Sequence, residues 1–227
     1  MKGVIFDLDG TLIDSESLWA RAEAEVAAAG GVLWTEADAF SCFGRPLAVT
    51  AQAIVDKGLD AGVDDVVDRL IDTMATLYRA GVPWIPGARE LLEDLVRAGQ
   101  RTALGTQSFR SLAELVKAEA PAGSLEQLVT GDELTNGKPD PEVFLAATER
   151  LGLSPEDVVV VEDSPTGVSA ALAAEIPVVA VPATEQVYED VRALGKVSTV
   201  PDIRTLTPAL LAAVRGGEQI NMRPGPR

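Results

Sequence analysis

Four short polar stretches each follow an apolar run of the sequence, and together they could form a catalytic site. They read Asp7-Leu-Asp9-Gly10-Thr11, Gly105-Thr106-Gln107-Ser108, Gly137-Lys138-Pro139 and Glu162-Asp163-Ser164. Carboxylates that cluster repel one another, so they need a shared proton or a cation. The ligands offered would be oxygens, and the chain has no histidine. Mg²⁺ is therefore the expected cation.

The same residue types suit phosphoryl transfer. Asp7 and Asp9 lie two residues apart at the end of an apolar run, so one can attack phosphorus while the other serves as acid and then as base. Thr106 and Lys138 could contact the transferred phosphate. The metal and the ammonium group would then stabilise the charge that develops in the transition state. A small phosphorylated molecule is the expected substrate.

These stretches need a scaffold that brings them together. Short runs rich in β-branched residues precede or include them, and consecutive apolar positions indicate strands that are buried on both faces. Helical patterns such as 88–98 and 141–151 separate the runs. The sequence therefore predicts an α/β fold with a doubly wound parallel sheet, in which ligands bind beyond the carboxyl ends of the strands. The predicted strands are Val4–Phe6, Thr102–Leu104, Leu128–Thr130, Val158–Val161 and Val178–Val181.

One segment interrupts the alternation of strands and helices. Residues 15–81 carry helical patterns and no convincing strand, and this is too long for a simple crossover between two strands. We interpret it as an inserted, all-helical cap subdomain. The catalytic core would then comprise residues 1–14 and 82–215. Residues 216–227 are polar and contain Gly and Pro, and we expect a flexible tail there.

Composition narrows the class of protein. The chain has 227 residues, a net charge of -16 and a pI near 4.3, so we expect it to bind neither nucleic acid nor anionic membrane surfaces, which its charge repels. Its single cysteine, Cys42, allows no intramolecular disulfide and is expected to be a small buried side chain. No signal peptide or membrane span is apparent. We expect a cytoplasmic monomer.

The motifs resemble those of a known family. The stretch Val-Ile-Phe-Asp-Leu-Asp-Gly-Thr-Leu at 4–12 resembles the first motif of the haloacid dehalogenase-like hydrolase superfamily. Thr106 is similar to the second motif, Lys138 in Gly-Lys-Pro-Asp-Pro to the third, and the stretch Glu162–Gly167 to the fourth. The resemblance extends from residue 1 to about residue 200. It implies a Rossmann-like core with a helical cap, similar to β-phosphoglucomutase and sugar-phosphate phosphatases.

The resemblance also implies individual roles. Asp7 would be the phosphoaspartyl nucleophile and a Mg²⁺ ligand, and Asp9 the general acid and base with its backbone carbonyl on the metal. Thr106 and Lys138 would hold the phosphoryl group. Asp163 would be a metal ligand, and Glu162 either a ligand or a residue behind the ligands. Residues placed near the substrate are Gly10, Gln107 and, from the cap, Glu16, Trp19 and Arg45.

Three alternatives compete with a phosphatase. Dehalogenases of this superfamily lack the second aspartate, so Asp9 favours phosphoryl transfer. A β-phosphoglucomutase-like mutase would use a cap histidine, where this sequence has Trp19 and contains no histidine at all. A non-catalytic binding protein on the same fold is the third alternative, which the full set of acids argues against. The favoured function is a Mg²⁺-dependent phosphatase for a small metabolite such as a sugar phosphate.

Overall fold

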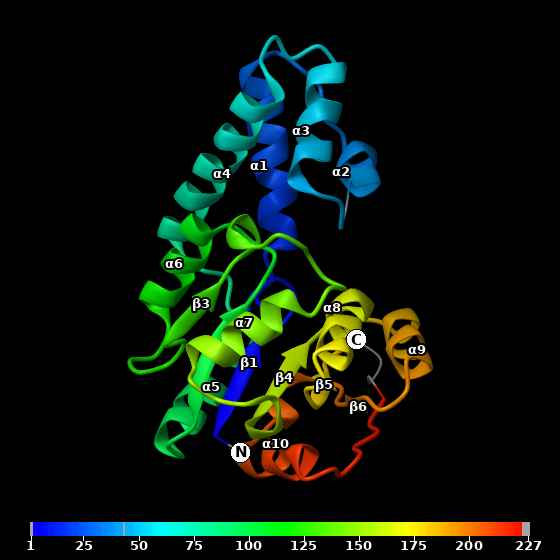
Figure 1. Cartoon of the computed structure of the whole chain (residues 1–227). Helices are drawn as coiled ribbons and strands as arrows, with labels where there is room; N and C mark the ends of the chain where they lie inside the picture. Colours follow the sequence, from blue (N-terminus) through cyan, green and yellow to red (C-terminus); the bar gives the residue numbers. More distant parts are fainter. Residues whose placement is uncertain (1, 43, 224–227) are drawn as a thin grey trace. The chain divides into compact units, whose positions relative to one another are not determined.

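Six parallel strands form one sheet in the order β3-β2-β1-β4-β5-β6. The structure is a computed structural model that describes residues 2–42 and 44–223 (Figure 1). The strand order reverses direction on either side of β1, which makes the sheet doubly wound. This confirms the predicted fold class. The strands are β1 (Gly3–Phe6), β2 (Arg101–Gly105), β3 (Gln127–Val129), β4 (Val158–Glu162), β5 (Val178–Ala180) and β6 (Ser198–Thr199).

Both faces of the sheet are buried, as the runs of apolar residues predicted. Val4, Ile5 and Phe6 are all fully buried, although alternate residues of a strand point to opposite faces. Ile5 belongs to a cluster that includes Phe144 and Val168 from two helices. The helices of the core are α5 (Ala88–Arg97), α6 (Arg110–Glu119), α7 (Glu142–Arg150), α8 (Pro165–Ala173), α9 (Glu185–Ala193) and α10 (Pro208–Arg215).

The five predicted strands all form, each within a residue or two of its expected bounds. Strand β6 was not predicted, because it has only two residues and its side chains are Ser198 and Thr199. Such a run is too short to carry a periodic signal. It lies at the edge of the sheet and pairs with β5.

The chain divides into two compact units, Met1–Asp14 with Pro83–Arg227, and Ser15–Val82. The second unit holds α1 (Glu16–Ala29), α2 (Glu36–Cys42), α3 (Leu47–Asp56) and α4 (Val63–Ala80). No strand occurs among the residues of this unit that the structure describes. The helices enclose their own apolar cluster, which includes Trp34, Ile54 and Leu70. Cys42 is buried in this cluster as expected.

The two stretches of core next to the helical unit are joined to each other. Ile13 and Trp84 form an antiparallel bridge. The amide of Asp14 donates to the carbonyl of Pro83, and the amide of Ile85 donates to that of Leu12, each at 2.9 Å. The chain therefore leaves and re-enters the core at one fixed place.

The C-terminal segment differs from the expected flexible tail. Thr199 of β6 donates its amide to Ile220 at 2.7 Å, and Met222 donates to Thr199 at 2.9 Å. Arg223 also forms an ion pair with Glu189 of α9 at 2.6 Å. The backbone of residues 220–222 therefore completes the exposed edge of β6, which the polar composition of the segment did not reveal. The last part of the expected tail, 224–227, lies outside the described residues.

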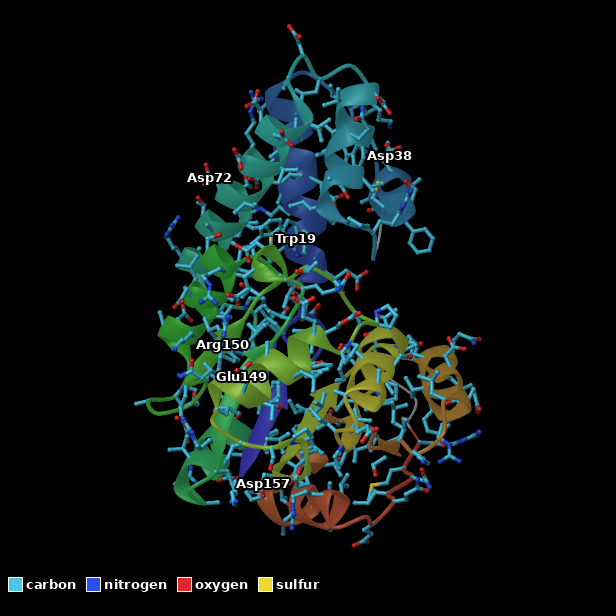
Figure 2. The ribbon with its side chains drawn as sticks, in the orientation of Figure 1. Trp19, Asp38, Asp72, Glu149, Arg150 and Asp157 are labelled. Carbon is cyan, nitrogen blue, oxygen red and sulfur yellow. The ribbon has the colours of Figure 1, made fainter. Side chains whose placement is uncertain are left out.

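A charged cluster fixes the loop after β3. Glu133 of the 3-10 helix η1 (Gly131–Glu133) accepts from Arg150 at 2.9 and 3.0 Å, from Arg110 at 2.7 Å and from the Thr130 amide at 2.8 Å. Figure 2 labels Arg150 and its neighbour Glu149 on α7. Burial alone would raise the pKa of Glu133, but these donors outweigh it and lower the pKa to about 2.

Replacing Glu133→Gln is expected to lower the free energy of unfolding by about 1 kcal/mol at pH 7, because charge-assisted hydrogen bonds are lost at a partly exposed site. The pKa is lower in the folded than in the unfolded chain, so this stabilisation is complete above the ordinary carboxyl pKa. It should disappear as the pH falls toward 2. Urea titrations of the two proteins at several pH values measure it, with the exposed Glu149→Gln as control. A difference that does not depend on pH would contradict this account.

Candidate active site

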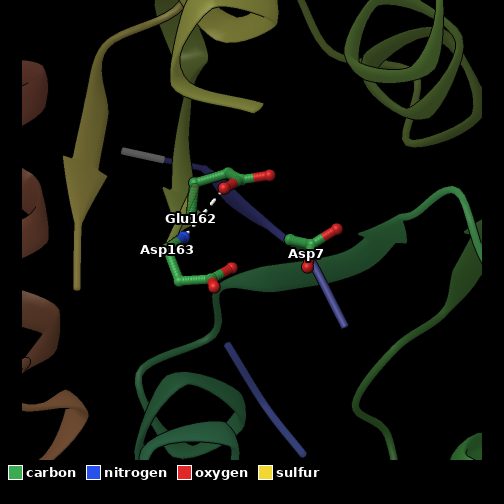
Figure 3. A group of neighbouring side chains, drawn as sticks. All are labelled: Asp7, Glu162 and Asp163. Atoms are coloured by element: carbon green, nitrogen blue, oxygen red, sulfur yellow. Dashed lines mark hydrogen bonds between the residues drawn. The ribbon is translucent and has the colours of Figure 1, made fainter. Parts of the chain in front are cut away.

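The register of the sheet brings two acids together. Phe6 of β1 lies opposite Val161 of β4, so Asp7 and Glu162 leave adjacent parallel strands at the same level. The amide of Asp7 continues the ladder by donating to the Val161 carbonyl at 3.0 Å. Figure 3 shows these two side chains with that of Asp163 at this end of the sheet. Oxygens from the three carboxylates lie within 4.8 Å of one another.

Lys138 joins this acidic group from the loop before α7. Its Nζ donates to Asp7 Oδ1 at 2.5 Å and to Glu162 Oε1 at 2.8 Å. The exposed fraction of the side chain is 3% for Lys138, 10% for Asp7 and 1% for Glu162. The ring of Phe144 lies 4.9 Å from the same ammonium, and an aromatic face attracts a cation. The structure thus brings Lys138 and Asp7 into direct contact.

The charges of the cluster do not balance. Burial raises the pKa of Asp7 well above its ordinary value; Lys138 opposes this, and the carboxylates of Glu162, Asp163 and Asp9 add to it. Burial, together with the charge of Glu162, raises the pKa of Asp163 to about 7. Although burial favours the neutral amine, Asp7 and Glu162 raise the pKa of Lys138 above its usual range. One ammonium therefore faces more negative charge than it can neutralise.

The loop after β1 holds the Asp163 carboxylate in place. Thr11 is buried and donates its hydroxyl to Asp163 Oδ1 at 3.0 Å. Gly10 has a φ of +86°, and a Cβ placed there would lie 2.4 Å from Asp163 Oδ2. Gly10 was predicted to lie near the substrate, and this stays a prediction. The structure shows that its missing side chain makes room for the Asp163 carboxylate.

The residues after β2 lie close to the Lys138 loop. Thr106 is buried, and its hydroxyl accepts from the Ser108 amide at 3.0 Å, which leaves its proton available for another acceptor. Gln107 is exposed, and a Cβ at Gly137 would lie 2.4 Å from its Nε2. The amide of Gln107 therefore packs on the residue that precedes Lys138. Gly105, by contrast, makes space for the core side chains Phe144 and Ile5.

Asp9 and three cap residues were also predicted to take part in the site. Asp9 is half-buried, and its charge contributes to the raised pKa of Asp7, so the two side chains are near each other. In the helical unit, Trp19 is partly buried and packs against the apolar cluster of that unit. Glu16 and Arg45 are exposed. Their predicted contact with a substrate stays a prediction.

Two residues near the reactive groups were not assigned roles from the sequence. Thr11 fixes Asp163 and Phe144 lies against the Lys138 ammonium. Thr11 stands within the first polar stretch, so its position offered a signal. Phe144 looks like any apolar residue of an amphipathic helix, and only the fold reveals its contact.

The acidic group fits a hard divalent cation. The candidate ligands, from Asp7, Asp163 and Glu162, are all carboxylate oxygens, which suits Mg²⁺ rather than zinc or copper. Burial and the neighbouring carboxylates raise the pKa values of Asp7 and Asp163, and a divalent cation would offset this repulsion.

Each of the described helices is too short or too polar to span a lipid bilayer.

Comparison with known proteins agrees with the geometry. The family described as haloacid dehalogenase-like hydrolase matches residues 1–175. The chain belongs to this family. It is therefore a hydrolase on the predicted fold.

Individual relatives cover most of the chain. Hexitol phosphatase A of Escherichia coli is 35% identical over 180 residues, which is 79% of this chain and 82% of that protein. A phosphorylated carbohydrates phosphatase of Thermotoga maritima is 33% identical over 225 residues, or 97% and 96% of the two chains. The crystal structure of a candidate β-phosphoglucomutase from Thermotoga maritima is 30% identical, with a TM-score of 0.79 over 92% of this chain and 98% of that one.

The raised pKa of Asp163 predicts a pH-dependent response to metal. In the metal-free protein Asp163 holds its proton more tightly when folded than when unfolded, so the free energy of unfolding should fall as the pH rises from about 4 to about 7. A divalent cation competes with that proton. The increase in Tm on adding Mg²⁺ should therefore be larger at pH 8 than at pH 5.5.

Thermal melts with EDTA or with Mg²⁺ across this range measure the response. The variant Asp163→Asn, which keeps an oxygen for Thr11, should lose most of the Mg²⁺ effect. An equal Tm increase at both pH values, or a full response in Asp163→Asn, would show that Asp163 does not bind the cation.

Proposed function

We propose that this hydrolase is a Mg²⁺-dependent phosphatase that transfers the phosphoryl group of a small metabolite to Asp7 and then to water. The observation that carries the proposal is the ammonium of Lys138, which contacts the carboxylate of Asp7 in a buried site. An ammonium beside a carboxylate nucleophile can hold a phosphoryl oxygen and reduce its repulsion from the carboxylate. The relatives named hexitol phosphatase and phosphorylated carbohydrates phosphatase support this reaction type.

In the first step an oxygen of Asp7 attacks phosphorus, and the bond from phosphorus to the leaving oxygen breaks. Asp9 gives its proton to that leaving oxygen, which departs as an alcohol. Lys138, which contacts Asp7, and the Thr106 hydroxyl, which can still donate its proton, would contact the phosphoryl oxygens. In the second step Asp9 takes a proton from water, the water oxygen attacks phosphorus, and Asp7 is released with inorganic phosphate.

Asp7 and Asp163 would hold the metal, with the backbone carbonyl of Asp9. Bound Mg²⁺ supplies positive charge to the phosphoryl oxygens and to the crowded carboxylates. Two residues position the Asp163 carboxylate: Thr11 donates a hydrogen bond to it, and Gly10 leaves room for it.

Water is the favoured acceptor of the phosphoryl group. A mutase must return it to a second sugar hydroxyl, and the family's mutases use a cap histidine that this chain lacks, since its sequence contains none. The structural likeness to a candidate β-phosphoglucomutase keeps a mutase as the second candidate. The substrate class favoured by the relatives is a sugar phosphate or a sugar alcohol phosphate.

A panel of phosphorylated metabolites tests the function. Wild-type protein with Mg²⁺ should release phosphate from at least one sugar or hexitol phosphate, and EDTA should abolish the release. Asp7→Asn should lower the rate at least about a thousandfold, because the nucleophile is lost. Isomerised sugar phosphate without phosphate release would favour the mutase. Equal rates for wild type and Asp7→Asn would refute the proposal.

The Asp9→Asn variant separates the two steps. An aryl phosphate has a good leaving group that needs little acid, so Asp7 should still be phosphorylated, while hydrolysis slows because no base activates water. Mass spectrometry after rapid quenching should find a mass increase of about 80 Da on the peptide that contains Asp7. The control is Asp14→Asn, which changes an exposed acid five residues after Asp9. This variant should turn over normally. Label on any other residue, or none in Asp9→Asn, would contradict the covalent route.

A further inference from the structure

Every oxygen of the Glu162 carboxylate is already engaged by the protein. Oε2 accepts from the amide of Asp163 at 2.8 Å, shown as the dashed line in Figure 3. It also accepts from the amide of Ser164 at 2.7 Å and from the Ser164 hydroxyl at 2.9 Å. Oε1 accepts from Lys138 Nζ at 2.8 Å. Glu162 is thus anchored on one oxygen and holds Lys138 with the other.

The Ser164 hydroxyl has its single proton committed to Glu162. It caps α8 by accepting from the Gly167 amide at 3.1 Å, and it lies 3.3 Å from the hydroxyl of Thr166. An ionised carboxylate can only accept, so the Ser164 proton must point to Glu162. Ser164 therefore links the start of α8 to the carboxylate that contacts Lys138.

Gly167 leaves the space that Glu162 occupies. A Cβ at this position would lie 1.6 Å from Glu162 Oε1 and 1.9 Å from its Cδ. Gly167 is in the first turn of α8 with no positive φ, so its backbone does not require glycine. Glycine is unfavourable within a helix, and the carboxylate of Glu162 gives the physical reason for it here.

We propose that Ser164 and Gly167 are positioning residues for phosphoryl transfer, which act through Glu162 to hold the Lys138 ammonium against Asp7. Ser164 fixes the Glu162 carboxylate by a hydrogen bond, and Gly167 leaves room for this carboxylate beside the first turn of α8. Glu162 then serves as the anchor of Lys138 rather than as a metal ligand. This inference rests on the proposed function for its kinetic consequence, but its structural part can be tested without turnover.

The main variant is Ser164→Gly. Glycine is accepted at helix N-caps, so α8 keeps its start while the hydroxyl is lost. The matched control is Ser169→Ala in the same helix, where the hydroxyl donates to the Pro165 carbonyl at 2.8 Å. Ser164→Thr retains the hydroxyl and should restore function. Gly167→Ala is a second, independent disturbance of the same carboxylate.

Ser164→Gly should lower kcat/KM about 10–100-fold, the usual effect of losing a residue behind a catalytic group. Inhibition by inorganic phosphate should weaken with it, because Lys138 no longer holds the anion well. Both effects should persist at saturating Mg²⁺. Gly167→Ala should also lose activity, because its Cβ would displace the Glu162 carboxylate from its present position.

Two kinetic results would overturn the proposal. One is a Ser164→Gly enzyme with the same rate and phosphate inhibition as Ser169→Ala. The other is full recovery of its rate by raising the Mg²⁺ concentration, which would show that Ser164 acts through a metal ligand. Failure of Ser164→Thr to recover activity would also count against a role for the hydroxyl.

Labelling with an amine-reactive reagent followed by mass spectrometry gives a readout that needs no activity. The side chain of Lys138 is 3% exposed and that of Lys2 is 64% exposed, so Lys2 serves as the internal reference. Ser164→Gly should increase the labelling of Lys138 relative to Lys2 several-fold, and Ser169→Ala should not. If the wild type releases no phosphate from any substrate, the proposed function fails while labelling still decides this inference. Unchanged labelling of Lys138 would overturn it.

Discussion

The site depends on the buried ammonium of Lys138, which contacts both Asp7 and Glu162. Burying charges is costly unless they are paired and hydrogen-bonded, and here a single cation is shared by two carboxylates beside a third, Asp163. The excess negative charge raises the pKa values of Asp7 and Asp163. The same excess of negative charge suits the carboxylates to a divalent cation, so the stability of the folded chain and the chemistry proposed for it are linked.

That contact is possible because the sheet sets its geometry. Parallel pairing of β1 and β4 in register brings Asp7 and Glu162 to the same level, and pairing of β1 with β2 places the Thr106 loop on the other side. The loop before α7 then delivers Lys138, while Phe144 of α7 lies against its ammonium. Side chains from distant parts of the chain meet without a dedicated subdomain, because adjacent strand ends already lie close together.

The sequence predicted most of the fold and most of the side chains that meet at the candidate site, because strands buried on both faces and acids at their ends leave strong local signals. It did not predict β6, or the pairing of residues 220–222 with that strand, since short polar segments have no periodicity. It also left the role of Glu162 open and did not reveal that Gly10 lies against Asp163. Both questions depend on which atoms approach across the fold: Lys138 is 24 residues from Glu162, and the Asp163 carboxylate is the group that needs the space at Gly10.

A crystal structure with Mg²⁺ and beryllium fluoride, a mimic of the phosphoryl group, would identify the nucleophile and the residue that holds Lys138. We expect beryllium bonded to an oxygen of Asp7, Lys138 in contact with both the fluorides and Glu162, and the metal bound by Asp7 and Asp163. Beryllium on another residue would contradict Asp7 as the nucleophile. A Glu162 carboxylate that leaves Lys138 to bind the metal would contradict the division of roles between the acids.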